Sequence, residues 1–411
     1  MAGKDPSPRA LGKLLRRKQR KHHSLLSKVE KTAARLDRQK VKLQALESRI
    51  ADLERQTAGA VDPRTGQGDP DGARRHARLI FNPASGRTEE NNAERLGQIV
   101  NSLRAHGIQA HIGLKTSGKA ARALAREAVR SGHQLVIVAA GDGTIEEVAS
   151  QLVGTPTVLG IVPIGTMNNI ARSLGVPLGI DDACALIGMG TTRHIDTGRV
   201  VSSDSPEIRH FLEAAGVGLS AMAVLAGQAA EKRQWRMIPK ALRSYFETKP
   251  GHVHVQIDDV VIEAATNIVT VSNAPLMGGN LLISPEAKMD DGLLDVRVYD
   301  GMSSVALAKH FLASSSGSAD PIRTYRGRKV RITTEEPVLT HSDKELTRKS
   351  RTVEIEILPG ALTVIVGNGI ALTVPVEAAP DSHPLEYVIP ATNGRLEEAL
   401  APAKPEEVLS E

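Results

Sequence analysis

The chain has 411 residues, of which 52 are Lys or Arg and 47 are Asp or Glu, so its formal net charge is +5. Its 2% aromatic content argues against base-stacking platforms for single-stranded nucleic acid, and its single cysteine, Cys184, excludes an internal disulfide and a cysteine zinc site. No stretch approaches the roughly 18 apolar residues of a membrane-spanning helix, and the basic N-terminus lacks the apolar segment of a secretion signal. We therefore expect a cytoplasmic protein with room for two domains.

The first 24 residues are predicted to form a basic arm. Residues 11–22 carry six Lys or Arg and no acid. Such an arm is attracted to anionic surfaces, so we expect it either to make peripheral contact with a membrane or to stay solvated. Because this basic charge is confined to one arm and no recognition motif accompanies it, we expect no nucleic-acid partner.

Residues 25–57 are predicted to form a coiled-coil helix. Apolar residues follow heptad spacing in two registers. One is Val29, Leu36, Leu43 and Ile50, and the other is Leu25, Leu46 and Leu53, interrupted by Thr32 and Gln39. This spacing forms a seam between two helices and predicts a homodimer. The alternative is a lone amphipathic helix that lies on the body of the protein. Residues 58–73, rich in Gly, Pro and Asp, are predicted to be a linker.

Residues 74–197 are predicted to form an α/β domain around a parallel sheet. A strand at 77–81 precedes helices at about 91–106 and 119–130, and the apolar run at 135–140 predicts a buried strand. Cys184 lies on a predicted helix beside Leu186 and Ile187, and we expect it to be a buried structural thiol. Strands that alternate with helices form parallel sheets, and ligands bind beyond the carboxyl ends of such strands.

Three turns of small residues follow strands of this domain. They are Asn82–Gly86, Gly141–Thr144 and Gly165–Asn168. Glycine lets the backbone approach a ligand closely, and the helix that follows presents N–H groups to an anion. Each turn alone is also compatible with a tight connection between strand and helix. Together they favour a polyphosphate site, and the absence of a following Gly-Lys-Ser/Thr excludes a Walker A loop.

Residues 198–375 are predicted to form a β-rich domain, most simply a sandwich. Alternation with period two predicts strands at 252–257, 260–264, 267–272, 293–298, 329–333, 353–357 and 361–366. The Ala-, Pro- and Glu-rich tail, residues 376–411, is predicted to be largely disordered.

Two groups of carboxylates in the β-rich domain are candidates for chemistry. Asp290, Asp291 and Asp295 surround Gly292. Hard oxygen ligands of this kind suit Mg²⁺, although a solvated Asp-Gly turn explains them as well. Asp343 and Glu345 lie in a loop between strands, where a carboxylate could accept a hydroxyl proton or simply face solvent.

In order and spacing, the motifs of this chain resemble those of the diacylglycerol kinase catalytic-domain family, with bacterial soluble lipid kinases the most similar. These motifs are Asn82-Pro-x-Ser-Gly86, Gly141-Asp-Gly-Thr-x-x-Glu147, Gly165-Thr-x-Asn168, Ser284-Pro-x-Ala287 with Asp291-Gly-x-Leu-Asp295, and Asp343-x-Glu345. The similarity extends over residues 77–367. The N-terminal helix and the acidic tail lie outside it.

The resemblance implies an α/β nucleotide domain and a β-sandwich with ATP between them, and transfer of the ATP γ-phosphoryl group to a lipid hydroxyl. The lipid would be diacylglycerol-like or sphingoid and would be met at a membrane surface. The positions that match the family's ATP contacts are Asn82, Pro83, Ser85, Gly86, Thr116, Gly141, Asp142, Gly143, Thr144, Glu147 and Thr166. Its Mg²⁺ site matches the Asp291 carboxylate with the backbone carbonyls of Lys288 and Leu293. Its proton acceptor matches Glu345, with Asp343 as the second candidate.

The chain departs from the family's pattern at Ala140, Asn169 and Lys344, where Gly, Asp and Gly are expected. The change at Asn169 removes a carboxylate from the neighbourhood of the metal. Two alternatives stay open, the first because NAD kinases share a Gly-Asp-Gly turn and the second because of these departures. One is a kinase of a soluble substrate, similar to NAD kinases, and the other is a catalytically impaired adaptor that acts through its coiled coil.

Overall fold

The computed structural model describes residues 27, 31, 34, 37, 40–53, 55, 75–86, 91–117, 119–218, 251–266, 268–277, 281–302, 322–343, 345–346 and 349–367. They belong to two compact units, one of residues 1–74 with 90–101 and the other of residues 75–89 with 102–411. The basic arm, the linker and the C-terminal tail lie outside the described residues.

The smaller unit contains a helix over residues 40–53 and the first part of α2 (Asn92–Ala105). Leu46 and Leu53, from one heptad register, are only 4% and 1% exposed in the single chain. A Cβ on Gly97 of α2 would lie 3.5 Å from Nη2 of Arg49, so these helices are neighbours. This is the arrangement expected of an amphipathic helix that packs on its own chain. The homodimer stays a prediction.

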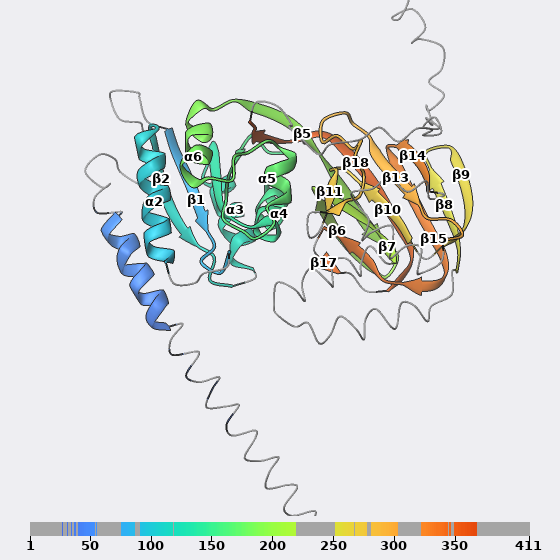
Figure 1. The fold of residues 1–411 in the computed structure, drawn as a ribbon, viewed down its shortest axis with the longest axis horizontal. Coiled ribbons are helices and arrows are strands. Elements are labelled where there is room, and N and C mark those ends of the chain that lie inside the picture. The colour runs from blue at the N-terminus through green and yellow to red at the C-terminus, as the bar shows by residue number, and fades with distance from the viewer. Residues whose placement is uncertain are drawn as a thin grey trace, which may run out of the picture. The chain divides into compact units, whose positions relative to one another are not determined.

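The larger unit begins with the predicted α/β arrangement (Figure 1). Its elements are β1 (Arg75–Phe81), β2 (Ile108–Leu114), α3 (Ala120–Arg130), β3 (Leu135–Ala140), α4 (Asp142–Leu152), β4 (Val158–Pro163), α5 (Asn169–Ser173) and α6 (Ile180–Met189). Strands β2, β1, β3 and β4 pair in this order and run parallel. All side chains of β3 are buried, as its continuous apolar run predicts. Strand β2 was not predicted, because Gln109 and His111 interrupt its apolar residues.

The β-rich half supplies the remaining strands. They are β5 (Thr192–Ser202), β6 (Ser205–Phe211), β7 (Ala214–Gly218), β8 (Gly251–Ile257), β9 (Val260–Thr266), β10 (Ile268–Ser272), β11 (Leu276–Met277), β12 (Leu281–Leu282), β13 (Leu294–Val298), β14 (Arg323–Gly327), β15 (Lys329–Val338), β16 (Thr340–Ser342), β17 (Glu345–Leu346) and β18 (Ser350–Ile365). Among the described residues, one sheet has the order β14-β13-β10-β7-β16-β17, and a larger sheet includes β4, β18, β15, β8 and β9.

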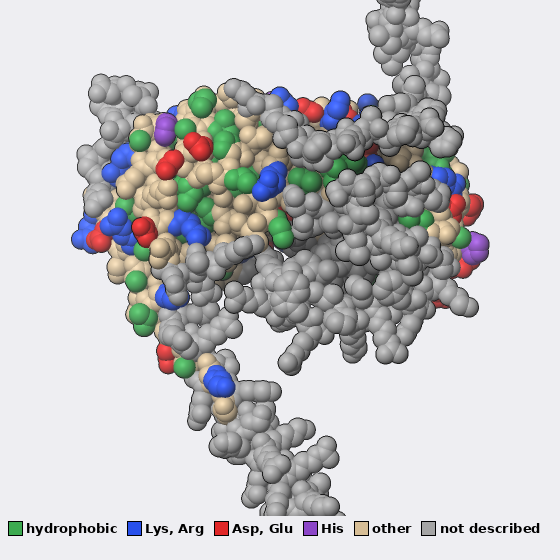
Figure 2. Space-filling view, viewed as in Figure 1, with side chains coloured by type: hydrophobic (Ala, Val, Ile, Leu, Met, Phe, Trp, Pro, Cys, Tyr) green, Lys and Arg blue, Asp and Glu red, His purple; other side chains and the backbone are tan. Residues whose placement is uncertain are grey.

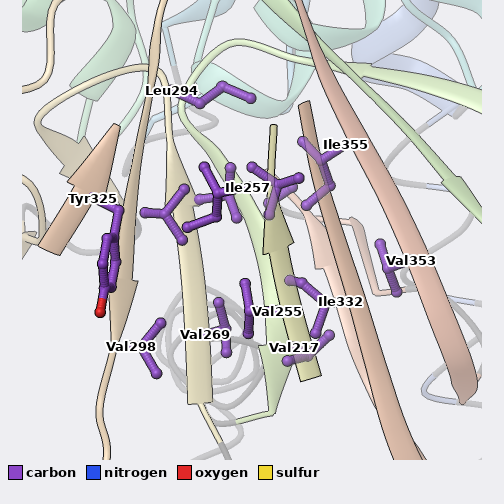
Figure 3. Packing of buried hydrophobic residues seen from close by; sticks show 14 of the residues in the cluster. Val217, Val255, Ile257, Val269, Leu294, Val298, Tyr325, Ile332, Val353 and Ile355 are labelled. Atoms are coloured by element: carbon purple, nitrogen blue, oxygen red, sulfur yellow. The ribbon is translucent and has the colours of Figure 1, made fainter. Parts of the chain in front are cut away.

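The predicted sandwich is confirmed by the core between these two sheets. Val217, Val269 and Val298 on the smaller sheet belong to the same buried cluster as Val255, Ile332 and Ile355 on the larger one (Figure 3). Alternate residues of each strand point into this core, which is why period-two alternation identified most of the strands.

Strand β18 joins the two halves of the larger unit. It pairs with β15 and β5 in the β-rich half and then, at Val364, with Leu159 of β4. The two strands predicted at 353–357 and 361–366 are thus one strand, with an irregularity between Leu358 and Leu362. The domain boundary predicted between residues 197 and 198 falls inside β5, and β5 belongs to the same sheet as β18. Within the described residues, no helix is long and apolar enough to cross a membrane.

Candidate active site

Two of the predicted turns meet at Gly141 and Gly165, which follow the adjacent strands β3 and β4. A Cβ on Gly141 would lie 3.1 Å from the Cα of Gly165, which is closer than most real contacts allow. A Cβ on Gly165 would overlap Gly141 and lie 2.7 Å from Oδ1 of Asn168. The contact therefore requires glycine on both sides and leaves the backbone of both turns uncovered.

The third turn, after β1, is bonded to the first residues of α4. Nδ2 of Asn82 donates to Oγ1 of Thr144 at 2.9 Å, and the N–H of Gly141 donates to Oγ of Ser85 at 3.2 Å. Gly86 has a φ of +92°, which favours glycine. The structure thus brings together the three predicted turns. Thr116 and Thr166 lie exposed just after β2 and β4, at this same edge of the sheet.

Lys115 is a site residue that sequence reasoning missed. Its Nζ donates to Oγ1 of Thr144 at 3.0 Å and to Oε2 of Glu147 at 2.6 Å. Its own N–H donates to the carbonyl of Phe81, so it directly extends β2 beside β1. A cation at the carboxyl end of β2, next to predicted phosphate contacts, is the only signal that could have identified it.

The buried carboxylate of Asp142 connects the two helices that follow the turns. It is 1% exposed, and its Oδ1 accepts the N–H of Ile170 in α5 at 3.1 Å. Asn168 has a φ of +55°, and its Oδ1 accepts the N–H of Gly165 at 2.9 Å. These bonds fix the second glycine turn relative to the first. The next residue, Asn169, is fully buried, and in the described part of the chain its amide atoms have no hydrogen-bond partner.

In the β-rich half, the predicted metal residue Asp291 forms an ion pair with Arg326 of β14. Its Oδ1 also accepts the N–H of Leu293 at 3.1 Å. Nε of Arg326 also lies 3.4 Å from Oδ1 of Asp295. Burial raises the pKa of Asp295 to about 6, while Arg326 opposes that shift and Asp291 adds to it. The three side chains form one polar cluster beside the loop that carries Lys288.

Asp196 of β5 holds that loop in place. Its two carboxylate oxygens accept the N–H groups of Gly292 and Gly360, each at 2.7 Å. Its N–H donates to the carbonyl of Met289 at 2.6 Å. Burial raises the pKa of Asp196, and the bonds from Gly360 and Gly292 oppose that rise. No motif in the sequence singled out this residue, because its partners are distant along the chain.

The two candidate proton acceptors differ in their surroundings. Asp343 is 3% exposed and has a φ of +47°, and its carboxylate accepts the N–H groups of Leu212, Glu213 and Ala214 at 2.8, 2.8 and 3.1 Å. These bonds indicate a structural role for Asp343. Glu345 pairs through its backbone with Ser342 in a β-hairpin. The side chain of Glu345 and all of Lys344 lie outside the described residues.

A pocket connects the two candidate regions. It is lined on one side by Gly143 and Glu147 of α4. Ile208 and His210 of β6 and the Asp343 turn line the other side. The Gly141–Thr144 turn, through Gly143, and the loop of the candidate base thus line one cavity. The Asp291 loop does not line it.

The donor set around Asp291 is compatible with Mg²⁺. One carboxylate and the carbonyls of Lys288 and Leu293 are hard oxygen ligands, although that carboxylate is also paired with Arg326. Within the described ranges, no three His, Cys, Asp or Glu side chains converge on one point. A metal here would depend on backbone oxygens and on its substrate.

Two family models match the chain. The diacylglycerol kinase catalytic domain matches residues 76–200, and the YegS C-terminal NAD kinase beta sandwich-like domain matches residues 214–366. Together they cover both halves of the larger unit, including all three turns and both groups of carboxylates.

Similar proteins carry related names. "Diacylglycerol kinase" of Bacillus subtilis is 29% identical over 237 residues, which cover 54% of this chain and 73% of that one. "Probable lipid kinase YegS-like" of Klebsiella pneumoniae is 27% identical over 281 residues, 66% of this chain and 91% of its own. The crystal structure of a diacylglycerol kinase from Bacillus anthracis has a TM-score of 0.57 at 25% identity and covers 72% of this chain and 98% of its own.

Proposed function

Because this chain belongs to the diacylglycerol kinase catalytic-domain family, we propose that it transfers the γ-phosphoryl group of ATP to a hydroxyl group of a lipid. The observation that carries this proposal is the meeting of three small-residue turns at one sheet edge, with Lys115 among them. Phosphoryl transfer depends mainly on positioning and on charge neutralisation, and this edge supplies both.

The turns would hold the triphosphate through backbone N–H groups. Gly141 and Gly143 leave room for the phosphates, and the N-terminus of α4 adds its dipole to the attraction. Lys115 lies within hydrogen-bond reach of Thr144 and so would meet the same phosphates. Asp142 would act indirectly, because its carboxylate is committed to α5.

Mg²⁺ would be held by the Asp291 carboxylate with the backbone carbonyls of Lys288 and Leu293. When bound, it would supply positive charge to offset the charge of the phosphates. Asp196 would keep this loop in position through its bonds to Gly292 and Gly360.

We assign the role of general base to Glu345 rather than Asp343. The Asp343 carboxylate already accepts hydrogen bonds from three backbone N–H groups, so its oxygens are committed to holding those strands together. Glu345 follows two residues later on a hairpin beside the pocket. A positioned base contributes typically about 10²–10⁴-fold to the rate.

The lipid would be reached at a membrane surface through the basic arm, at about 1 kcal/mol for each Lys or Arg near an anionic surface before salt screening. On the face shown in Figure 2, the Lys and Arg side chains that are visible are interspersed with Asp and Glu. The coiled-coil homodimer would double the number of arms.

The test is transfer of radiolabelled γ-phosphate from ATP to lipids in mixed micelles, with and without Mg²⁺. The panel includes diacylglycerol, a sphingoid base, ceramide and NAD. The proposal is supported if wild type produces labelled lipid and the Glu345→Gln variant does not. Labelled NAD with no labelled lipid would indicate a soluble-substrate kinase. Binding of ATP without any transfer would indicate the impaired adaptor.

A further inference from the structure

Three histidines gather on one face of the parallel sheet. The rings of His76 and His111 are stacked with their centroids 6.0 Å apart, and the ring of His133 meets that of His111 edge-on at 6.2 Å. His76 lies near the start of β1, His111 lies in β2, and His133 lies just before β3. We call these three residues the histidine cluster. The pairing of β1 with both β2 and β3 brings them together.

Arg78 belongs to the same face. It pairs with His111 across β1 and β2, and a Cβ on Gly113 of β2 would lie 3.3 Å from its Nε. The guanidinium therefore lies over β2, beside the His111 ring. Helix α3 approaches this face, because Oε2 of Glu127 lies 3.6 Å from Nη2 of Arg78. The Glu127 side chain is 58% exposed, so this ion pair offsets little of the charge.

The charge of this group is positive and has no strong counterpart. Burial lowers the pKa of His111, and His76, His133 and Arg78 lower it further. Among the residues that the structure describes, no carboxylate raises that pKa. Within the same residues, the three rings do not converge as metal ligands would, and Arg78 would repel a metal cation. The group is therefore suited to an anion.

Several nitrogens of the group have no hydrogen-bond partner. Nε2 of His76, Nδ1 of His133 and Nε of Arg78 are buried and make no hydrogen bond in the described part of the chain. Such atoms are normally paired in folded proteins, so three of them in one place indicate a missing polar group. Arg78 and the histidine cluster are only partly buried, and β2 is the outermost strand of the sheet, so a ligand has access from solvent.

The histidine cluster lies away from the three small-residue turns. Those turns follow the carboxyl ends of their strands, whereas His76 and His133 lie near the opposite ends of β1 and β3. A strand rises about 3.3 Å per residue, so His76 is roughly 16 Å from Phe81 at the end of β1. A ligand of the cluster would therefore be distinct from ATP bound at the turns.

We propose that Arg78 and the histidine cluster bind a phosphate group, either free in solution or on a lipid head group. This inference goes beyond the proposed function and does not depend on it. A guanidinium matches the geometry of phosphate oxygens, and an imidazole offers two N–H donors once it is protonated. The phosphate supplies the negative charge that the group lacks, and it favours the imidazolium form of the rings beside it.

The experiment follows the imidazole signals of the full-length protein by nuclear magnetic resonance, with ¹³C at Cε1 of histidine. The protein is titrated with acid in chloride and in phosphate at equal ionic strength, and His111→Gln identifies the signal of His111. We expect phosphate to raise the pKa of His111 by about 1 and to leave the titration of His252, which is exposed on β8, unchanged. Arg78→Gln should abolish the difference between the buffers. Lys115→Gln, which alters the proposed ATP site, should preserve it.

The source of the phosphate is tested with dihexanoyl phosphatidic acid in chloride. A larger rise in the pKa of His111 than inorganic phosphate produces assigns the site to a lipid head group, and a smaller rise assigns it to a free oxyanion. If neither probe changes the titration of His111 in wild type, the proposal is wrong. It is also wrong if folded Arg78→Gln responds like wild type. The readout uses no ATP, so a protein that phosphorylates no lipid would refute the proposed function and leave this test unaffected.

Discussion

Gly141 and Gly165 touch through their backbones, so that a Cβ on Gly141 would lie only 3.1 Å from the Cα of Gly165. The two residues follow the adjacent parallel strands β3 and β4 and precede α4 and α5. Their contact sets the distance between two of the turns that would hold the phosphates. Loss of that contact should therefore affect nucleotide binding before it affects the fold.

Gly165→Ala is expected to weaken ATP binding by at least tenfold, because the new methyl group must push the two turns apart. Titration calorimetry with ATP measures the effect. Gly251→Ala is the matched control, since a Cβ at Gly251 meets nothing within 4 Å. Equal affinity in both variants would show that the spacing of the turns does not govern nucleotide binding.

Lys115→Gln is expected to weaken ATP binding by about tenfold, because a charge-assisted contact with phosphate contributes about 1.5–3 kcal/mol. Its present partners, Thr144 and Glu147, are at 3.0 and 2.6 Å and lie in the first turns of α4. Equilibrium binding of ATP measures the change, with the exposed Lys119→Gln as control. The assignment fails if both variants bind ATP like wild type.

The variants Asp343→Asn and Glu345→Gln should show which of the two carboxylates stabilises the fold and which acts as the general base. In Asp343→Asn, the side-chain NH₂ group would face a backbone N–H group that now donates to a carboxylate oxygen, so that hydrogen bond would be lost. We therefore expect the unfolding free energy to fall by about 1–3 kcal/mol. Glu345→Gln should keep stability and lower kcat by about 10²–10⁴-fold. Denaturant unfolding and steady-state kinetics measure the two. The opposite pattern would make Asp343 the base.

Acid should destabilise the protein through His341. Burial lowers the pKa of this imidazole from 6.5 to about 4, and the nearby backbone of Asp343 opposes the shift only in part. Between these values the unfolded chain binds the proton and the folded chain does not, so stability falls as pH falls from 6.5 toward 4. The full effect is up to about 3 kcal/mol. Between pH 6.5 and 4, the unfolding free energy should depend less on pH in His341→Leu than in wild type. The same dependence in both proteins would contradict the assignment of this effect to His341.

Much of the α/β half was predictable because its signals are local. Leu135–Ala140 is an uninterrupted apolar run, and it is the fully buried strand β3. The glycines at 141 and 165 indicated turns, and the order of strands and helices placed both turns at one edge of a parallel sheet. Cys184 is buried on α6, as its apolar neighbours predicted.

The contacts of Lys115, Asp196 and Asp343 were not predictable, because each depends on residues far away in the sequence. Asp343 bonds to Leu212, and Asp196 bonds to Gly360. A carboxylate in a loop has the same local pattern whether it faces solvent, accepts a proton or ties two strands together. Burial and partners distinguish these roles, and both come from the packing of distant segments.

The sequence by itself determined the kinds of elements, the three small-residue turns after strands and the motifs that identify the family, since these depend on neighbouring residues. Only the tertiary structure decided that β18 returns to pair with β4, that the two glycines touch, and that three histidines gather beside Arg78. Strand pairing across long sequence separations sets these relationships. Backbone hydrogen bonds are the same for any side chains, so no local pattern records which strands will meet.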